Sequence, residues 1–475
     1  MGLLSAIGAS DAPYLPFINT GTMVDLMTGA FVAGAEGNWV LNGGLGATNG
    51  VMGKPQVFKS TLALALMMNA AARCPGSEIF INDSEYSQSK TRLLETINLH
   101  HDAPEERAAM ISKMSDNFVL SNPSQHDLET FMEEVKKLAA EKKRLIKDYT
   151  VEAPIIDPKT GKPQRMLIPT FVAIDSLSKA RVKSAADMMD KYAASSPETN
   201  TMFMRENLAK TKIMAMIPRM AVEAGIYFMF TAHVGNKIDM SGSYGPPPKD
   251  MQYMKQGQSV KNVGSDFTFL VSNLIESTSA TVLMDSDKEC QYPLTSGLTG
   301  PTELSTVNAI LVRCKNNSSG VQFKPVLSQT RGLETELTDY HYLRNNEYFG
   351  LMGSKINHSP IMCPDVKMTR TNAHTKLMDY KTARAIELLG QLCYIQNNWT
   401  IRGEHVQYRM TPEELTDALV KRSGYAMDDI LNSRGWWTYG EHPRSYLSLF
   451  DVIGIASGHY KPKLIAVTPP KIKSK

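Results

Sequence analysis

The fold is decided by the stretch Gly53-Lys54-Pro55-Gln56-Val57-Phe58-Lys59-Ser60-Thr61, which runs directly into an apolar segment at residues 62–68. A pliable turn, a lysine and a hydroxyl residue stand just before a helix start. In a loop of this layout, backbone N–H groups cradle phosphates, Lys59 reaches the terminal ones and Ser60 holds Mg²⁺. Phe58 takes the place of the usual second glycine. Spacing alone therefore fits a nucleotide site and an ordinary loop-to-helix junction equally well.

Three short apolar runs follow, at residues 79–81, 171–174 and 226–232, and polar side chains stand at or just beyond their ends. Buried parallel strands are unbroken apolar runs, and ligands bind beyond their carboxyl ends. The glycine-rich segment 43–52 before the loop has poor β propensity, so we expect the first core strand to be the weakest element. The pattern predicts an α/β fold in which one sheet edge gathers Lys59, Glu85, Asp175 and His233.

In order and spacing, these residues resemble the RecA/UvsX family of homologous recombinases, especially its large-phage branch. The shared features are the Phe-Lys-Ser end of the phosphate loop, Asp-Ser-Glu at 83–85, Ile-Asp-Ser at 174–176 in the Walker B strand, and a histidine at the sensor position. The match runs from about Leu15 to Leu337. It implies a RecA-like P-loop NTPase core with a mainly parallel central sheet flanked by helices. Beyond about residue 345 the resemblance fades, and we expect residues 346–462 to form a separate, smaller and mostly helical C-terminal domain of unknown role.

The resemblance also implies roles for single residues. Glu85 would activate the attacking water, Asp175 would hold the Mg²⁺ shell, and His233 would report the γ-phosphate to the following loop. Lys315 would reach a neighbouring subunit's γ-phosphate, although Asn317 replaces the second cation of that pair. The nucleotide-binding positions are then Gly53, Gln56, Val57, Phe58, Lys59, Ser60, Thr61 and Arg92, with Arg92 at the adenine-stacking position.

Three of these residues have a plainer interpretation from the sequence alone. Glu85 fits a solvated acid at a strand end, and Asp175 fits the cap of the following turn. Arg92 fits an ordinary surface charge on a predicted helix.

A long stretch after the third strand, residues 235–262, has no helical or strand period. Such a segment inside a compact domain is usually functional or disordered. Lysines that track phosphates, interleaved with rings that stack on bases, suit single-stranded nucleic acid. An ordinary long loop is the alternative, and the resemblance favours the second DNA-binding loop, with the first within residues 177–225. The DNA-binding candidates are Tyr244, Lys249, Tyr253, Lys255 and Lys261.

The chain has 475 residues, 42% of them hydrophobic and 21% charged, which is typical of a globular protein of more than one domain. No apolar run approaches the ~20 residues that span a bilayer. The five cysteines are scattered without a Cys-x-x-Cys pair, so we expect reduced thiols in the cytoplasm, the host cytoplasm if the gene is phage-borne. A net charge of +3 permits nucleic-acid binding without arguing for it.

We divide the chain into a short N-terminal segment (1–38), an ATPase core (39–345), a C-terminal domain (346–462) and a basic tail (463–475). Within these parts we expect a helix in 126–149, a hairpin turn at 157–163, a late core strand at 306–313 and a helix that a capping box opens at Thr411. The family's docking helix and strand would be shortened or absent, which puts filament formation by the usual route in doubt.

The sequence thus predicts a DNA-dependent ATPase that uses ATP and Mg²⁺, coats single-stranded DNA and promotes homologous pairing and strand exchange in recombination, repair and replication. Its expected partners are single-stranded DNA, copies of itself in a filament or ring with ATP at the subunit interface, and single-strand-binding and mediator proteins, without a membrane. Two alternatives stay open: a hexameric replicative helicase, and a nucleotide-binding scaffold or filament protein with little catalysis.

Overall fold

The computed structural model describes residues 15–97, 104–121, 127–158, 160–183, 202–237, 249–264, 266–294, 304–399, 409–422 and 424–462. The predictions for the first 14 residues, for Tyr244, for the basic tail 463–475 and for part of the first DNA-binding loop lie outside these ranges. None of the helices in the described ranges combines the length and the apolar character that crossing a membrane requires.

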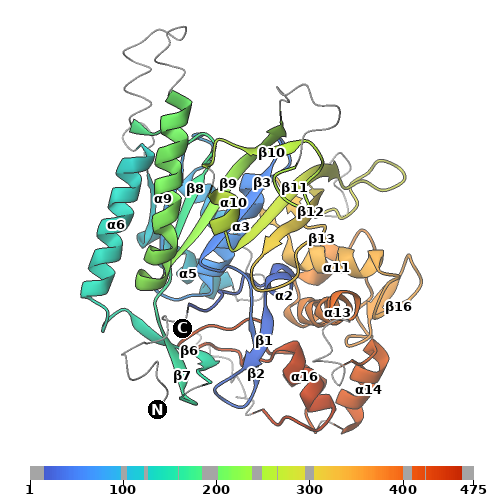
Figure 1. The fold of residues 1–475 in the computed structure, drawn as a ribbon. Coiled ribbons are helices and arrows are strands. Elements are labelled where there is room, and N and C mark those ends of the chain that lie inside the picture. The colour runs from blue at the N-terminus through green and yellow to red at the C-terminus, as the bar shows by residue number, and fades with distance from the viewer. Residues whose placement is uncertain are drawn as a thin grey trace, which may run out of the picture.

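Within the described residues, eleven strands form one mixed sheet at the centre of the molecule (Figure 1). From β11 to β5, all neighbouring strands are parallel, and the remaining strands pair antiparallel. The predicted parallel sheet is therefore one part of a larger mixed sheet, and the strand predicted at 306–313 is β12. In spatial order the strands are β15 (Gly332–Leu333), β14 (Val326–Ser328), β12 (Leu304–Cys314), β11 (Asn273–Val282), β3 (Thr48–Gly53), β9 (Ile226–Asn236), β8 (Thr170–Asp175), β4 (Glu78–Asp83) and β5 (Phe118–Ser121), with β10 (Gln258–Lys261) on β9 and β13 (Val321–Phe323) on β12.

Strand β3 lies in the middle of the sheet, between β11 and β9, and all of its residues are buried. A Cβ at Gly50 would lie 2.8 Å from Leu274 Cδ1, and one at Gly53 would lie 2.6 Å from the Ser277 carbonyl oxygen. Gly50 and Gly53, which lower the β propensity of this segment, are therefore small enough to fit against the neighbouring residues of β11. Tertiary packing overrides β propensity here, which corrects the prediction made from composition.

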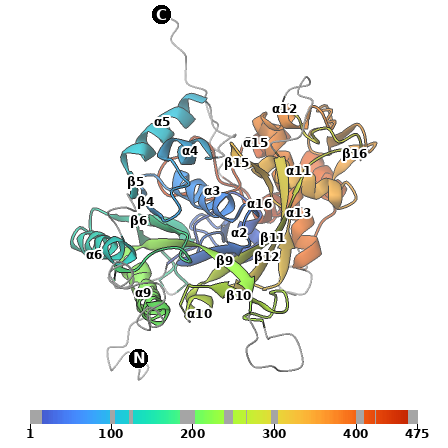
Figure 2. The same cartoon turned by 90° about the horizontal axis from the view of Figure 1, so that it is seen from above.

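Helices cover both faces of this sheet (Figure 2). Alternation along β8 sends Phe171 to the core beneath α3 and Val172 to the core beneath α6 and α9, so the strand is buried on both sides. The helix expected to start after the loop is α3, and the helix predicted within 126–149 is α6. One face carries α3 (Lys59–Ala72), α4 (Lys90–Glu95) and α5 (Pro104–Asp116), and the other carries α6 (Leu128–Arg144), α9 (Met202–Ala224) and α10 (Phe267–Leu270).

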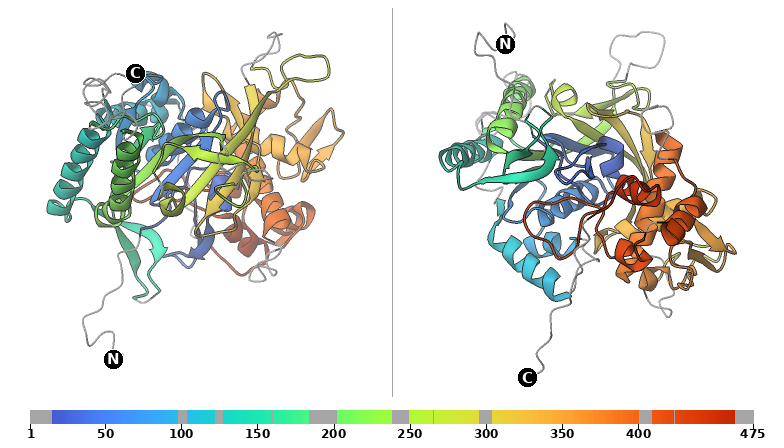
Figure 3. Two further views of the ribbon diagram at one scale, coloured as in Figure 1. Left: turned by 45° about the horizontal axis from the view of Figure 1, so that its top comes forward. Right: turned by 90° about the horizontal axis from the view of Figure 1, so that it is seen from below.

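Two hairpins lie beside the sheet and can be followed in Figure 3. Strands β6 (Thr150–Ile156) and β7 (Pro163–Leu167) flank the turn predicted at 157–163, which the structure confirms. Strands β1 (Ala30–Ala33) and β2 (Trp39–Asn42) follow the short helix α2 (Val24–Thr28). A backbone bridge between Gly34 and Ile155 joins the two hairpins.

In the region after residue 334, the regular elements of the described residues are mainly helices. Its predicted capping box is confirmed, because the Glu414 N–H donates to Thr411 Oγ1 at 3.1 Å and the Thr411 N–H donates to Glu414 Oε2 at 2.9 Å. The elements are α11 (Thr335–Asn345), β16 (Leu351–Gly353), β17 (His358–Pro360), α12 (Ala373–Leu377), α13 (Tyr380–Asn398), α14 (Pro412–Arg422), α15 (Met427–Leu431) and α16 (Leu449–Ala456).

The N-terminal hairpin packs against this C-terminal region (Figure 1). The Phe31 ring stacks on Phe450 with centroids 4.0 Å apart, and the Trp39 N–H donates to Asp451 Oδ1 at 2.7 Å. One hydrophobic core continues from α2 through α3 to α13 and α16. The boundaries placed at residues 38 and 345 remain predictions, since the parts on either side share this core.

Candidate active site

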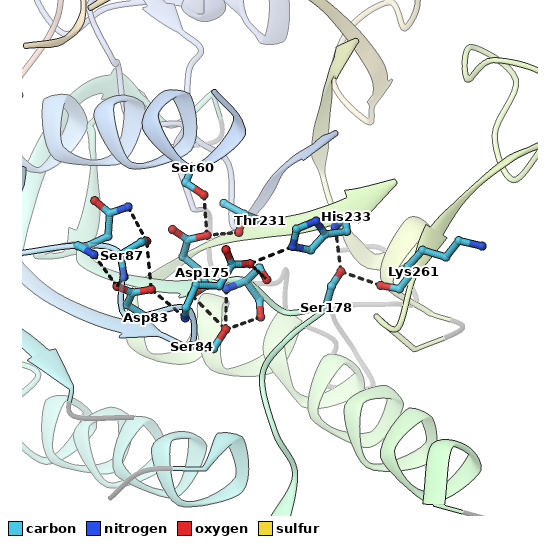
Figure 4. Close-up of polar contacts among 12 residues, drawn as sticks. Ser60, Asp83, Ser84, Ser87, Asp175, Ser178, Thr231, His233 and Lys261 are labelled. Atoms are coloured by element: carbon cyan, nitrogen blue, oxygen red, sulfur yellow. Dashed lines mark hydrogen bonds and ion pairs between the residues drawn. The ribbon is translucent and has the colours of Figure 1, made fainter. Parts of the chain in front are cut away.

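The carboxyl ends of β3, β4 and β8 meet at one edge of the sheet, and β9 passes beside them. β3 leads into the loop before α3, β8 ends at Asp175, and β4 ends at Asp83, two residues before Glu85. His233 lies within β9, opposite Gly53. This edge therefore brings together side chains from four segments that are far apart in the sequence (Figure 4).

The loop before α3 holds two non-glycine residues in the left-handed region, Gln56 at φ 63° and Phe58 at φ 57°. Phe58 is the N-cap residue of α3, so it adopts a conformation that glycine usually supplies. A side chain there costs about 1–2 kcal/mol. The half-buried Phe58 ring packs against the main core, which offsets part of that cost. The loop thus turns into the helix without the second glycine.

Ser60 and Thr231 both donate a hydroxyl hydrogen bond to Asp175 Oδ1, and the Ser60 bond measures 2.9 Å. Asp175 is 1% exposed, and its Oδ2 atom has no hydrogen-bond partner among the described residues. Burial raises the pKa of Asp175 to about 6, and the hydrogen bonds from Thr231 and Ser60 counteract only part of that rise. An unpartnered, buried carboxylate oxygen thus lies beside a hydroxyl at a helix start.

These two residues fit Mg²⁺, a hard cation that is usually bound by one or two carboxylates together with substrate phosphates and water. Asp175 Oδ2 supplies an oxygen donor without a protein partner, and the Ser60 hydroxyl is adjacent to the same carboxylate. Across the ranges that the structure describes, no cluster of three or more His, Cys, Asp or Glu side chains could hold a metal by itself.

Glu85 is held by two side chains that both bind the same oxygen. His233 Nε2 lies 2.9 Å from Glu85 Oε1, and the Ser176 hydroxyl donates to Oε1 at 2.8 Å. Burial raises the pKa of Glu85, but these hydrogen bonds and the nearby Lys59 charge outweigh it, and the net pKa is lowered. The Glu85 side chain is 33% exposed, so an ionised carboxylate at this edge is open to water.

Two residues that hold this cluster together, Asp83 and Thr231, were not predicted to have a role from the sequence. Asp83 is 2% exposed and accepts backbone N–H bonds from Glu85 at 3.1 Å, Ser87 at 2.7 Å and Gln88 at 2.7 Å. It therefore shapes the turn that presents Glu85, and a strand-end Asp before serine is the signal for such a turn. Thr231 binds Asp175, and a lone polar residue in the apolar run 226–232 was the available sign of it.

Lys59, the second lysine of the loop, is 8% exposed. Its ammonium has neither a hydrogen bond nor an ion pair with any described residue. Lys54 is exposed, and its charge acts on Glu276 of β11, whose pKa is raised by burial and partly lowered by Lys54. The two lysines of the loop therefore face different surroundings.

The predicted residues Arg92 and Lys315, and Asn317 at the position of the expected second cation, make their printed contacts outside this cluster. The Arg92 guanidinium donates to the Gln329 carbonyl at 3.1 Å, and the Lys315 ammonium donates to the Leu270 carbonyl at 2.8 Å. The Asn317 amide donates to the carbonyls of Leu26 at 3.2 Å and Gly29 at 2.9 Å. Asn317 is thus bound to the N-terminal segment of its own chain.

The segment 235–262 contains a strand that its sequence pattern did not predict. β10 pairs antiparallel with β9, so the base of the segment is a hairpin, and this corrects the expectation of a stretch without strands. Lys249 binds the Gln252 carbonyl, and Lys255 is exposed. The Tyr253 ring is 40% exposed and lies over Gly320, where a Cβ would be 2.5 Å from it. Lys261 Nζ donates to the Asn236 carbonyl at 2.6 Å.

No protein-family model and no curated protein matches the chain. Solved structures that are similar to it include one described as the crystal structure of the RadB recombinase, with a TM-score of 0.32 and 12% sequence identity. That match covers 62% of this chain and 92% of the other.

Proposed function

We propose that the protein is a DNA-dependent ATPase that binds single-stranded DNA and promotes homologous pairing and strand exchange in recombination, repair and replication. One observation carries the proposal. At a single sheet edge, the buried Asp175 has a free oxygen beside the Ser60 hydroxyl, and the ionised Glu85 is held by His233 just before the 235–262 segment. The resemblance of these residues to the RecA/UvsX family supports the same function.

Hydrolysis of ATP needs positioning and charge stabilisation rather than a covalent intermediate. The N–H groups of the loop and of the first turn of α3 are suited to the phosphates, and the buried Lys59 ammonium forms no ion pair with a described acid. Ser60 and Asp175 are the residues that would hold Mg²⁺. When bound, that ion would neutralise charge on the phosphate oxygens.

Glu85 is the group suited to take the proton of the attacking water. His233 and Ser176 both bind Oε1, so Oε2 has no protein partner among the described residues and can accept a proton. The lowered pKa keeps this carboxylate ionised at neutral pH, which is the form a general base requires. Its two hydrogen bonds hold the Glu85 carboxylate in one orientation. Oε2 is therefore already in position to accept the proton before the reaction begins.

The 235–262 segment is the part we assign to single-stranded DNA. It starts two residues after His233, and its described lysines and Tyr253 offer charge for phosphates and a ring for bases. If the protein assembles with ATP at a subunit interface, the resemblance assigns Lys315 to a neighbour's nucleotide, and its ammonium would then have to leave the Leu270 carbonyl.

One observation favours a second candidate, a nucleotide-binding scaffold with little turnover. Asn317 stands where a second interface cation is expected, and its amide is engaged by carbonyls of its own chain. Such a protein would bind nucleotide through the same loop but would lack one of the cations that turnover requires.

The test is the ATPase rate of the full chain with and without poly(dT), together with electron micrographs of the same mixtures. We expect turnover that the DNA stimulates, on continuous protein–DNA filaments. Closed rings with DNA-stimulated turnover would indicate the helicase, and nucleotide binding without turnover would indicate the scaffold.

A further inference from the structure

Ser178 lies just beyond β8, between the candidate active site and the base of the 235–262 segment. It is 5% exposed, and its hydroxyl makes two hydrogen bonds. It accepts the His233 backbone N–H at 2.9 Å and donates to the Lys261 carbonyl at 2.7 Å (Figure 4). A hydroxyl has one proton, so the donation to Lys261 and the acceptance from His233 define a single orientation.

Lys261 belongs to two environments. It ends β10 and lies opposite His233 in the β9–β10 ladder, so its backbone is beside the active-site histidine. Its side chain lies over Gly235 and its ammonium binds the Asn236 carbonyl, where the chain leaves β9 for the segment. A DNA phosphate that bound the Lys261 ammonium would therefore act on Lys261, the residue whose carbonyl accepts the Ser178 hydrogen bond.

The next carbonyl along the chain is also held. Lys210 of α9 is fully buried, and its ammonium donates to the Asn262 carbonyl at 3.0 Å while pairing with Glu206 at 2.7 Å. Two successive carbonyls are thus bound from two different elements. Movement of this backbone relative to α9 and the end of β8 would have to break one of these bonds.

We propose that Ser178 is a positioning residue that couples DNA contact at Lys261 to the active site, through the Lys261 carbonyl, the Ser178 hydroxyl, His233 and Glu85. This inference rests on the proposed function and names how DNA would regulate that site. A shift of the Lys261 carbonyl would turn the Ser178 hydroxyl. The acceptor for the His233 N–H would then change, and with it the imidazole that orients Glu85 Oε1.

The experiment compares the wild-type full chain with Ser178→Ala and Ser178→Cys, which remove or weaken the donor, and with Ser178→Thr, which keeps a hydroxyl. The control is Ser457→Ala, because the Ser457 hydroxyl also donates to a carbonyl, Ile453 O at 2.8 Å, but in α16. The readout is the ratio of ATPase rates at saturating poly(dT) and without DNA, with poly(dT) affinity measured in parallel.

We expect Ser178→Ala and Ser178→Cys to lower the stimulation ratio by about fivefold or more, the lower end of usual coupling between sites. Poly(dT) affinity should change little, Ser178→Thr should recover most of the ratio, and Ser457→Ala should match the wild type. If Ser178→Ala fails to fold, Ser178→Cys carries the test. A wild-type ratio in the folded Ala or Cys variant would overturn the coupling and leave the ATPase assignment standing. A wild-type protein without DNA stimulation would overturn both.

Discussion

Glu85 and His233 meet across the end of β8, with His233 Nε2 2.9 Å from Glu85 Oε1 although 148 positions separate them in the chain. Glu85 follows β4, His233 lies on β9, and β8 between them ends in Asp175. The pair therefore spans the strand that carries the candidate Mg²⁺ residue. The carboxylate that we propose to activate water and the histidine next to the segment that we propose to bind DNA are connected by one hydrogen bond.

Replacing Glu85 by Gln should slow turnover by ~10²–10⁴-fold, the usual worth of a positioned general base. The amide keeps the shape and can still bind His233 and Ser176, but it cannot take a proton. Nucleotide affinity should hold because it depends on Lys59 and the loop. Single-turnover ATP hydrolysis and the lifetime of DNA complexes in ATP measure both effects, and the complexes should last longer.

The control for that change is Glu413→Gln, in the exposed first turn of α14, which should leave the rate unchanged. An intact ATPase in the Glu85 variant would place the proton acceptor elsewhere.

Lys59→Ala should abolish nucleotide binding or turnover, whereas Lys54→Ala should do little. Lys59 begins α3 and is buried without a partner among the described residues, while Lys54 is exposed on the other side of the loop turn. Calorimetric titration with a non-hydrolysable ATP analogue separates the two variants. Equal damage from both would mean that the phosphate-binding register is wrong.

The affinity that Mg²⁺ adds to nucleotide binding should fall as the pH drops through about 6. Burial raises the pKa of Asp175 to about 6, and Mg²⁺ needs the ionised carboxylate, so acidification removes the ligand. The lowered pKa of Glu85 keeps that group ionised over the same range. Titrations from pH 8 to pH 5 with and without Mg²⁺ measure the effect.

Asp175→Asn supplies the background for this measurement, because it has no carboxylate to protonate at that position. It should bind nucleotide with little gain from Mg²⁺ at any pH. A gain from Mg²⁺ in the wild type that stays constant down to pH 5 would contradict the assignment.

Neutralising Lys249, Lys255 and Lys261 should weaken binding to poly(dT) and flatten its salt dependence, by roughly 0.7 units of log–log slope per lost phosphate contact. ATPase activity without DNA is the companion measurement and should persist. The matched control neutralises Lys113, Lys136 and Lys137, which are exposed on α5 and α6 and give the same change of net charge. A slope equal to that of the control would remove the segment from the DNA site.

Gly53→Ala should destabilise the loop and impair nucleotide binding, because the added Cβ would lie 2.6 Å from a backbone oxygen, Ser277 O. Gly390→Ala is the matched control, since a Cβ in α13 would lie 3.4 Å from the Asp339 Cβ, an ordinary contact. That change should raise the free energy of unfolding by roughly 0.5–1 kcal/mol, the usual gain of alanine over glycine inside a helix. Thermal unfolding of both variants tests whether Gly53→Ala lowers the free energy of unfolding while Gly390→Ala raises it.

Much of this arrangement could be predicted where neighbouring residues decide the structure. The helix after Ser60, the apolar runs of β4, β8 and β9, and the capping box at Thr411 all follow from local propensity and hydrogen bonding. The strand ends also predicted which side chains would share an edge, because parallel strands present their carboxyl ends together. Roles for Glu85 and Asp175 in catalysis remain predictions.

The sequence by itself determined the local elements and the polar residues at their ends, because propensity, capping and alternation act between near neighbours. Tertiary structure alone decided that the glycine-rich β3 is central, that β10 returns along β9, and that Asn317 binds its own N-terminal segment. It also decided that Ser178 lies between His233 and Lys261. These features depend on close packing between segments far apart in the chain, and a pattern along the sequence does not record which distant strand becomes a neighbour.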